Sequence, residues 1–328
     1  MSTFACTHVT LQCPVEASVY SYQPSLGANA FFLAIYSTCA CAQLVLGIRF
    51  RTWTFMIALI LGGLCEGLGY VGRILLALNP WDALGFKIQS ECSITYNGIT
   101  WQCTDCLIVC CLIMGPAFTT AGIYLTFKHF VLAFGQRYSV LAAHLYTWLF
   151  ISADIFSLIL QAAGGAISAS AASSNDADTA ETGTWIALAG IVFQVVSLLA
   201  FATLFALYFF RLFRHRSQLP RQTTDTIHSF SFRLFFAAII LAYMTVLVRC
   251  IYRIPELAEG WGNRIMKSET DFIVLDGTMI TIATLALTLV HPGFCWSGLS
   301  KTTESTPDAR AAKDGSEGAV GTDLKSQV

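Results

Sequence analysis

Seven long apolar runs constrain the fold of this chain more than any other feature of its sequence. They occupy residues 28–48, 53–78, 106–130, 142–168, 184–210, 231–253 and 271–290. Each run reaches the roughly 20 residues that an α-helix needs to cross the hydrocarbon core of a bilayer. Because lipid offers the backbone no hydrogen-bond partners, runs of this length span as helices. The sequence therefore predicts an all-α, polytopic membrane protein with seven transmembrane helices.

The composition agrees with a membrane protein. Of the 328 residues, 55% are hydrophobic and only 12% are charged, and the mean hydropathy is +0.63. Soluble chains carry about 25% charged residues. The net charge of −1 gives no sign of binding to nucleic acid.

Lysine and arginine are distributed unevenly between the two ends of the predicted helices. If the N-terminus lies outside, thirteen of the 19 basic residues fall on the cytosolic side. Cytoplasmic loops carry the excess of positive charge in membrane proteins. We therefore expect an outer N-terminal segment (1–27), a membrane domain (28–296) and a polar, disordered cytosolic tail (297–328).

Polar side chains interrupt several of the apolar runs in their middle or outer halves. Residues spaced i, i+4 and i+7 share a helix face, as Glu66, Tyr70 and Arg73 do. Intramembrane charges usually face a bundle interior or a wet cavity. We expect a polar cavity open to the outer side; the alternative is an ion-pair network that only locks the bundle. The predicted substrate-binding residues are Glu66, Tyr70, Arg73, Asp154, Gln161, Gln194, Arg249, Arg253, Glu256 and Asp276.

Four cysteines lie in predicted outer segments. Cys6 and Cys13 precede the first helix, and Cys92 and Cys103 lie in the loop 79–105. Outer compartments favour disulfides, and four cysteines allow three pairings. We expect a Cys92–Cys103 bridge, with free thiols as the alternative.

An ordered series of motifs covers residues 20–296. It comprises Tyr22-x-Pro24-Ser25-x-x-x-Asn29, Glu66-x-x-Gly69-Tyr70-x-x-Arg73, Pro116-x-x-x-x-Ala121-x-x-Tyr124, Asp154-x-x-Ser157-x-x-x-Gln161-x-x-Gly164-Gly165, Arg249-x-x-Tyr252-Arg253-x-x-Glu256-x-x-x-Gly260, Glu269, Asp276 and His291-Pro292. Together these motifs resemble the fungal RTA-like family, also called lipid-translocating exporters. One departure is Met114-Gly115-Pro116, where the family often has Ala before the proline.

The resemblance implies a function in lipid export. Members of the family are linked to resistance to toxic sterols, to release or flipping of sphingoid long-chain bases and, in one branch, to porphyrin transport. We expect an integral protein of the plasma membrane, with vacuolar or endosomal membranes as alternatives. The expected partners are membrane lipids, a sphingoid base or a sterol-like amphiphile, and neither a cofactor nor enzymatic activity is expected.

Two other functions remain open at this point. A seven-span receptor or sensor fits the topology, but the chain lacks Asp-Arg-Tyr, Asn-Pro-x-x-Tyr and a lysine in the seventh run. A zinc-dependent intramembrane hydrolase would need a metal site, yet the six histidines include no HExxH motif. The chain also lacks GxxxxGK[ST], which argues against ATP-driven pumping by this chain alone.

The charge distribution leads to a test of orientation. A tag added after Val328 should be accessible only after the membrane is permeabilised, and a tag before residue 22 should be accessible on intact cells. Antibody labelling of intact and permeabilised cells measures both. A C-terminal tag that is labelled on intact cells would contradict the predicted topology.

Overall fold

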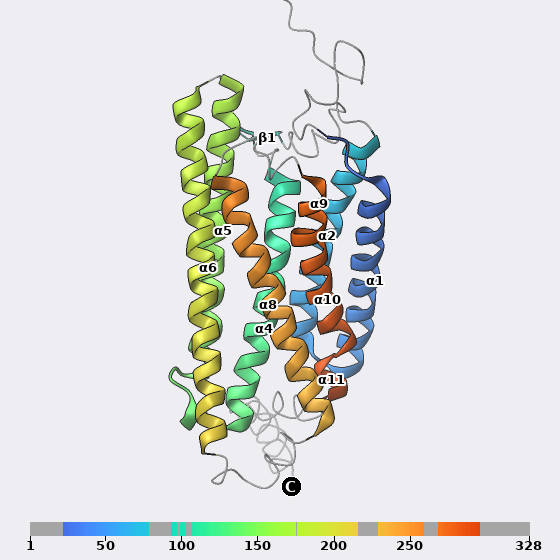
Figure 1. Cartoon of the computed structure of the whole chain (residues 1–328), viewed down its shortest axis with the longest axis vertical. Helices are drawn as coiled ribbons and strands as arrows, with labels where there is room; N and C mark the ends of the chain where they lie inside the picture. Colours follow the sequence, from blue (N-terminus) through green and yellow to red (C-terminus); the bar gives the residue numbers. More distant parts are fainter. Residues whose placement is uncertain are drawn as a thin grey trace, which may run out of the picture.

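A bundle of long helices forms the body of the protein (Figure 1). The computed structural model describes residues 22–78, 93–96, 99–102, 106–174, 176–215, 229–258 and 268–295. Within this part of the chain, seven helices are long and apolar enough to cross a membrane, which confirms the predicted number of spans. The long helices are α1 (Leu26–Phe50), α2 (Trp53–Leu78), α4 (Cys106–Phe134), α5 (Ala143–Ser174), α6 (Ala177–Arg214) and α8 (Phe230–Ala258).

The seventh span is built from three consecutive segments. These are α9 (Glu269–Asp271), the π-helical stretch η4 (Phe272–Thr278) and α10 (Met279–Leu289). Two short helices lie beside the long ones, η2 (Gln136–Tyr138) and α11 (Pro292–Cys295). The helices extend beyond several of the predicted runs; α6, for example, begins at Ala177 rather than near residue 184.

Successive helices run up and down and pack against their neighbours. The extensive contacts join α5 to α6, α1 to α2, α2 to α4, and α8 to α10. In Figure 1, the α5–α6 hairpin stands on one side of the bundle and α1 on the other. In that view α2, α4, α8 and α10 are drawn between them.

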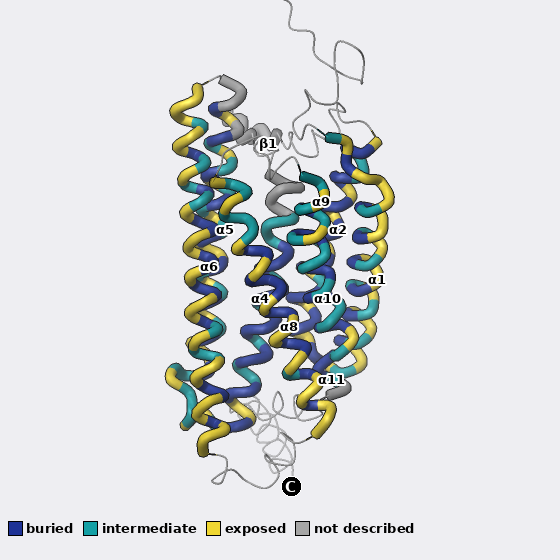
Figure 2. Tube along the Cα trace, in the orientation of Figure 1, coloured by how far each residue is buried: buried dark blue, intermediate teal, exposed yellow. Residues whose placement is uncertain are grey.

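Buried and exposed residues alternate along the helices (Figure 2), and many of the exposed residues are large and apolar. Trp148 is 77% exposed and Phe210 is 63% exposed, although both are large and apolar. Apolar surface of this extent is typical of a face that contacts lipid. The exposed faces therefore agree with an integral membrane protein.

A short hairpin connects α2 to α4, and the sequence analysis did not predict it. Strand β1 (Ser93–Tyr96) pairs with strand β2 (Ile99–Gln102) in antiparallel fashion, with Ser93 opposite Gln102. Cys92 immediately precedes β1 in the chain and Cys103 immediately follows β2. Both cysteines lie outside the described residues, so their disulfide stays a prediction.

The two ends of the bundle differ in charge, and we name them accordingly. The basic end carries Arg49, Arg51, Arg137, Arg211 and Arg214, and the hairpin end carries β1 and β2. The basic end corresponds to the side that the sequence analysis assigned to the cytosol.

Aromatic rings fill the half of the bundle that lies nearer the basic end. The ring of Phe127 in α4 is a centre of this packing. Its centroid lies 4.9 Å from that of Tyr146, 5.4 Å from Phe201, 5.1 Å from Phe205 and 5.5 Å from Tyr208. Such pairs add about 0.5–1.5 kcal/mol each beyond the area they bury. The rings therefore leave no room for charged side chains between α4, α5 and α6 at this level.

His291 connects the end of the seventh span to the turn between α1 and α2 through its two ring nitrogens. Its buried Nδ1 accepts a hydrogen bond of 3.0 Å from the backbone N–H of Gly293. The ring proton therefore lies on Nε2, which is 3.4 Å from Oγ1 of Thr52. Burial lowers the pKa of His291 to about 4, so the imidazole is neutral at physiological pH.

Glycines bring the backbones of α5 and α6 into direct contact. A Cβ atom at Gly164 would lie 2.6 Å from the carbonyl oxygen of Gly183, and one at Gly183 would lie 2.7 Å from that of Gly164. Small residues allow this close approach of helices within membranes. The neighbouring Gly165 has nothing within 4 Å of its Cβ position.

This difference predicts opposite outcomes for two adjacent substitutions. Gly164→Ala should destabilise the protein by about 1–3 kcal/mol, because the methyl group meets backbone atoms that cannot yield. Gly165→Ala should be neutral or stabilising, because alanine is the better helix former. Thermal unfolding of the purified variants in detergent measures both. Equal melting temperatures for the two variants would contradict the α5–α6 packing.

Candidate functional site

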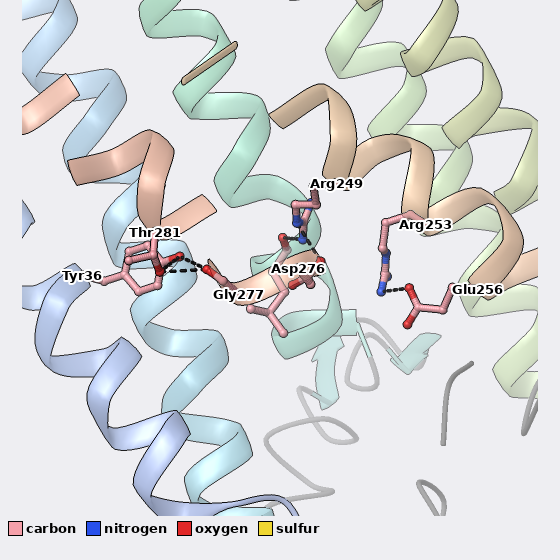
Figure 3. Close-up of polar contacts among 8 residues, drawn as sticks. Tyr36, Arg249, Arg253, Glu256, Asp276, Gly277 and Thr281 are labelled. Carbon is pink, nitrogen blue, oxygen red and sulfur yellow. Dashed lines mark hydrogen bonds and ion pairs between the residues drawn. The ribbon is translucent and has the colours of Figure 1, made fainter. Parts of the chain in front are cut away.

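A buried ion pair joins the sixth and seventh spans at the centre of the site. Nε of Arg249 in α8 lies 2.7 Å from Oδ1 of Asp276 in η4 (Figure 3). The two side chains are only 4% and 2% exposed. The contact is close but lacks the angle of a regular hydrogen bond. Charges this deeply buried require partners, since an isolated ion in an apolar interior costs several kcal/mol.

The same guanidinium also donates to a backbone carbonyl of α4 that lacks its usual helical donor. Nη2 of Arg249 donates a hydrogen bond of 2.7 Å to the carbonyl oxygen of Leu112. In a regular helix that carbonyl would accept from residue 116, but Pro116 has no N–H. Arg249 supplies the missing donor. One side chain thus links α8, η4 and the proline bend of α4.

Glu66 and Tyr70 of α2 complete what we call the central cluster, defined as Glu66, Tyr70, Arg249 and Asp276. Glu66 is 2% exposed and Tyr70 is fully buried. The carboxylates of Glu66 and Asp276 both act electrostatically on Arg249. Gly115 makes room for Glu66, because a Cβ atom there would lie 2.5 Å from its Oε1. Two acids therefore surround one guanidinium.

The backbone around Asp276 is π-helical. Oγ1 of Thr278 donates to the carbonyl oxygen of Ile273 at 2.8 Å, across this widened turn. The hydroxyl oxygens of Thr281 and Tyr36 lie 2.8 Å and 3.4 Å from the carbonyl oxygen of Gly277 (Figure 3). π turns are rare and frequently occur at functional sites. The sequence analysis contained no signal for this turn.

Tyr70 lies against both α1 and η4. Its ring stacks on that of Tyr36, with centroids 5.5 Å apart and planes at 15°. A Cβ atom at Gly277 would lie 2.7 Å from its hydroxyl oxygen. This close approach of the Tyr70 hydroxyl to the backbone next to Asp276 therefore requires glycine at position 277.

Arg73 of α2 lies near the hairpin end and is held by α1 and η4. Its Nε donates to Oδ1 of Asn29 at 3.2 Å, and its Nη2 donates to the hydroxyl of Tyr22 at 2.9 Å. Its guanidinium carbon lies 3.8 Å from the ring centroid of Phe272. These contacts engage Tyr22 and Asn29, which belong to the first sequence motif.

Four other predicted residues form two local pairs outside the central cluster. Nη1 of Arg253 donates to Oε2 of Glu256 at 2.7 Å, and these side chains are 22% and 14% exposed (Figure 3). Nε2 of Gln161 in α5 donates to Oε1 of Gln194 in α6 at 3.0 Å. The first pair lies within α8, and the second joins α5 to α6.

Asp154 of α5 stands apart from the arginines. It is 3% exposed, and its Oδ2 lies 3.0 Å from Oγ1 of Thr120 in α4. Tyr124 directs its hydroxyl towards the same carboxyl group without reaching hydrogen-bond geometry. The structure therefore brings Glu66, Tyr70, Arg249 and Asp276 together and places Asp154 in a second polar site, between α5 and α4.

The predicted residues are enclosed in this conformation. Those of the central cluster, together with Arg73, Asp154, Gln161 and Gln194, are at most 6% exposed. Across the described ranges, no group of three or more His, Cys, Asp or Glu side chains is placed to hold a metal ion. These side chains are therefore largely shielded from solvent in this conformation.

The chain is similar to one family model and to several curated proteins. The family model "RTA1 like protein" matches residues 101–298. In Saccharomyces cerevisiae, the "Sphingoid long-chain base transporter RSB1" is 29% identical over 311 residues, which cover 87% of this chain and 76% of the relative. "Protoporphyrin uptake protein 1" is 26% identical over 231 residues, or 70% and 65% of the two chains. "Protein RTA1" is 23% identical over 288 residues, or 84% of each. No solved structure matches the chain.

The geometry predicts that the two arginines of α8 differ in their contribution to stability. Removing the cation of the buried pair, as in Arg249→Met, should destabilise the protein by about 3–5 kcal/mol, because carboxylates then remain inside without a counter-charge. Arg253→Met should cost at most about 1 kcal/mol, because its pair with Glu256 is partly exposed. Chemical unfolding in detergent measures these free energies. A larger loss for Arg253→Met than for Arg249→Met would contradict this assignment.

Proposed function

The chain belongs to the RTA1-like family, and from this we propose that it binds an amphipathic lipid and moves it across the membrane. The family match confirms the resemblance that the motifs indicated. The relative named as a sphingoid long-chain base transporter supports this function, since its similarity covers most of both chains. The names of the relatives give no support to enzymatic activity.

The central cluster is the observation that carries the proposal. A sphingoid base joins a protonated amine to a long hydrocarbon chain. Glu66 and Asp276 place two carboxylates around one guanidinium, so an amine can be held there as a second cation. The hydrocarbon chain of the lipid would lie between helices, whose faces are largely apolar.

Movement of the lipid requires the enclosed cluster to open. Two irregular segments border it, the π turn of η4 and the proline bend of α4. Kinked and π-helical segments leave backbone groups that can change partners. We propose that an amine at Asp276 competes with Arg249 and so weakens its bond to Leu112.

The proposal includes a location and an orientation. We place the protein in the plasma membrane, with the hairpin end outside and the basic end in the cytosol. The excess of arginine at the basic end supports this orientation. In this orientation the central cluster lies nearer the outside, where an exported lipid leaves.

Transport by purified protein tests the proposal. Proteoliposomes with the wild-type chain should move a radiolabelled sphingoid long-chain base between leaflets faster than empty liposomes. Glu66→Gln should stay folded and lower this flux by roughly 10–100-fold, because a charged hydrogen bond contributes about 1.5–3 kcal/mol. Glu181→Gln on the exposed start of α6 is the matched control and should leave the flux unchanged.

Each alternative has its own outcome in this experiment. If Glu66→Gln loses folded protein in proportion to lost flux, the cluster is only a structural ion-pair network. If the wild-type chain moves no lipid but changes conformation when the base is added, the receptor alternative replaces transport. Both readouts come from the same purified samples.

A further inference from the structure

Asp154 is a buried acid in an apolar environment, and its site differs in kind from the central cluster. Among the described residues it forms no ion pair, whereas Asp276 lies 2.7 Å from Arg249. An ionised carboxylate buried without a cation costs far more than a neutral one. The surroundings of Asp154 therefore favour the uncharged acid.

The hydroxyl proton of Thr120 links its two contacts to the protonation state of Asp154. Oγ1 of Thr120 lies 2.9 Å from the carbonyl oxygen of Ala117 and 3.0 Å from Oδ2 of Asp154. A hydroxyl group carries one proton, and a carbonyl oxygen can only accept. Both contacts become full hydrogen bonds if Thr120 donates to Ala117 and the carboxyl group donates to Thr120. That arrangement requires a proton on Oδ2 of Asp154.

The titratable groups around Asp154 provide no positive charge. Tyr124 faces it from α4, and Tyr243 and Cys250 face it from α8. Tyr243 donates its own proton to the carbonyl oxygen of Leu198. Oδ1 of Asp154 and the hydroxyl of Tyr124 are buried and make no hydrogen bond in the described part of the chain. The site thus has unused polar atoms and lacks a cation.

We propose that Asp154 is a proton-binding site that holds a proton in the enclosed state and exchanges it with water when the helices part. An O–H bond forms at Oδ2 with a proton taken from water on one side of the membrane. The same bond breaks on the other side, so one proton crosses in each cycle and no oxidant or reductant takes part. Coupling of this proton to lipid movement rests on the proposed function, whereas occupancy by the proton does not.

Helix α4 connects the proton site to the central cluster. Leu112, whose carbonyl oxygen binds Arg249, precedes Pro116 by one turn, and Thr120 follows Pro116 by one turn. The proline bend lies between the two contacts. Loss of the proton makes the carboxylate of Asp154 an acceptor from Thr120, whose hydroxyl proton then leaves the carbonyl oxygen of Ala117. The hydrogen bonding therefore changes beside the proline bend, whose Leu112 carbonyl binds Arg249.

Infrared spectroscopy of the purified chain tests the proton directly. The wild-type protein at neutral pH should show the carbonyl stretch of a neutral, buried carboxylic acid, and Asp154→Asn should lose that band. Asp176→Asn is the matched control, because Asp176 is exposed and asparagine is an equally good helix cap. Thr120→Val should shift the band, which keeps the test decisive if Asp154→Asn does not fold. A band that is absent from the wild type, or unchanged in both Asp154→Asn and Thr120→Val, overturns the proposal.

A pH gradient across proteoliposomes tests the coupling. Reversing the gradient should change the wild-type flux of a radiolabelled sphingoid base by up to about tenfold per pH unit. For Asp154→Asn the ratio of fluxes in the two gradient directions should be one, whatever the absolute rate. A wild-type flux that ignores the pH gradient, or responds to a sodium gradient instead, overturns the coupling. If the wild type moves no lipid at all, the proposed function fails, and the infrared result still decides whether Asp154 holds a proton.

Discussion

The need to compensate one buried guanidinium determines how the interior of this bundle is arranged. Arg249 lies deep among apolar helices, where an unpaired charge would destabilise the fold. Its ion pair with Asp276 and its hydrogen bond to Leu112 meet that need from two directions. Because both partners come from other helices, α8 is held in place relative to η4 and α4. The remaining packing is built around this junction.

The bundle separates polar chemistry from aromatic packing along its length. Rings around Phe127 fill the half nearer the basic end, while Arg249 and Asp276 lie nearer the hairpin end. The aromatic half is closely packed, with the ring centroids of Phe127 and Tyr146 4.9 Å apart and those of Phe127 and Phe201 5.4 Å apart. The other half contains a proline bend and a π turn, which are irregular by nature. We therefore expect conformational change in the polar half and support from the aromatic half.

The motifs that indicated the family coincide with contacts between helices. Tyr22 and Asn29 of the first motif bind Arg73 of the second. Pro116 of the third motif has no N–H, so the carbonyl oxygen of Leu112 is free to accept a hydrogen bond from Arg249 of the fifth motif. The family pattern thus describes how the spans recognise one another, and the polar site is a consequence of that assembly.

The sequence by itself determined the number of spans, the all-α class of the membrane domain, the family and the face shared by Glu66, Tyr70 and Arg73. The spans, the class and the shared face follow from run length, hydropathy and helical period, which are local properties. The family followed from the resemblance of the ordered motifs. Only the tertiary structure decided that Asp276 pairs with Arg249, that Asp154 faces Thr120 instead, and that η4 is π-helical. In spans that are apolar on most sides, the sequence pattern does not show which face points inward or which helices are neighbours. Partner choice therefore depends on how the helices pack, and the short hairpin between α2 and α4, which lies outside the apolar runs, was likewise visible only in the fold.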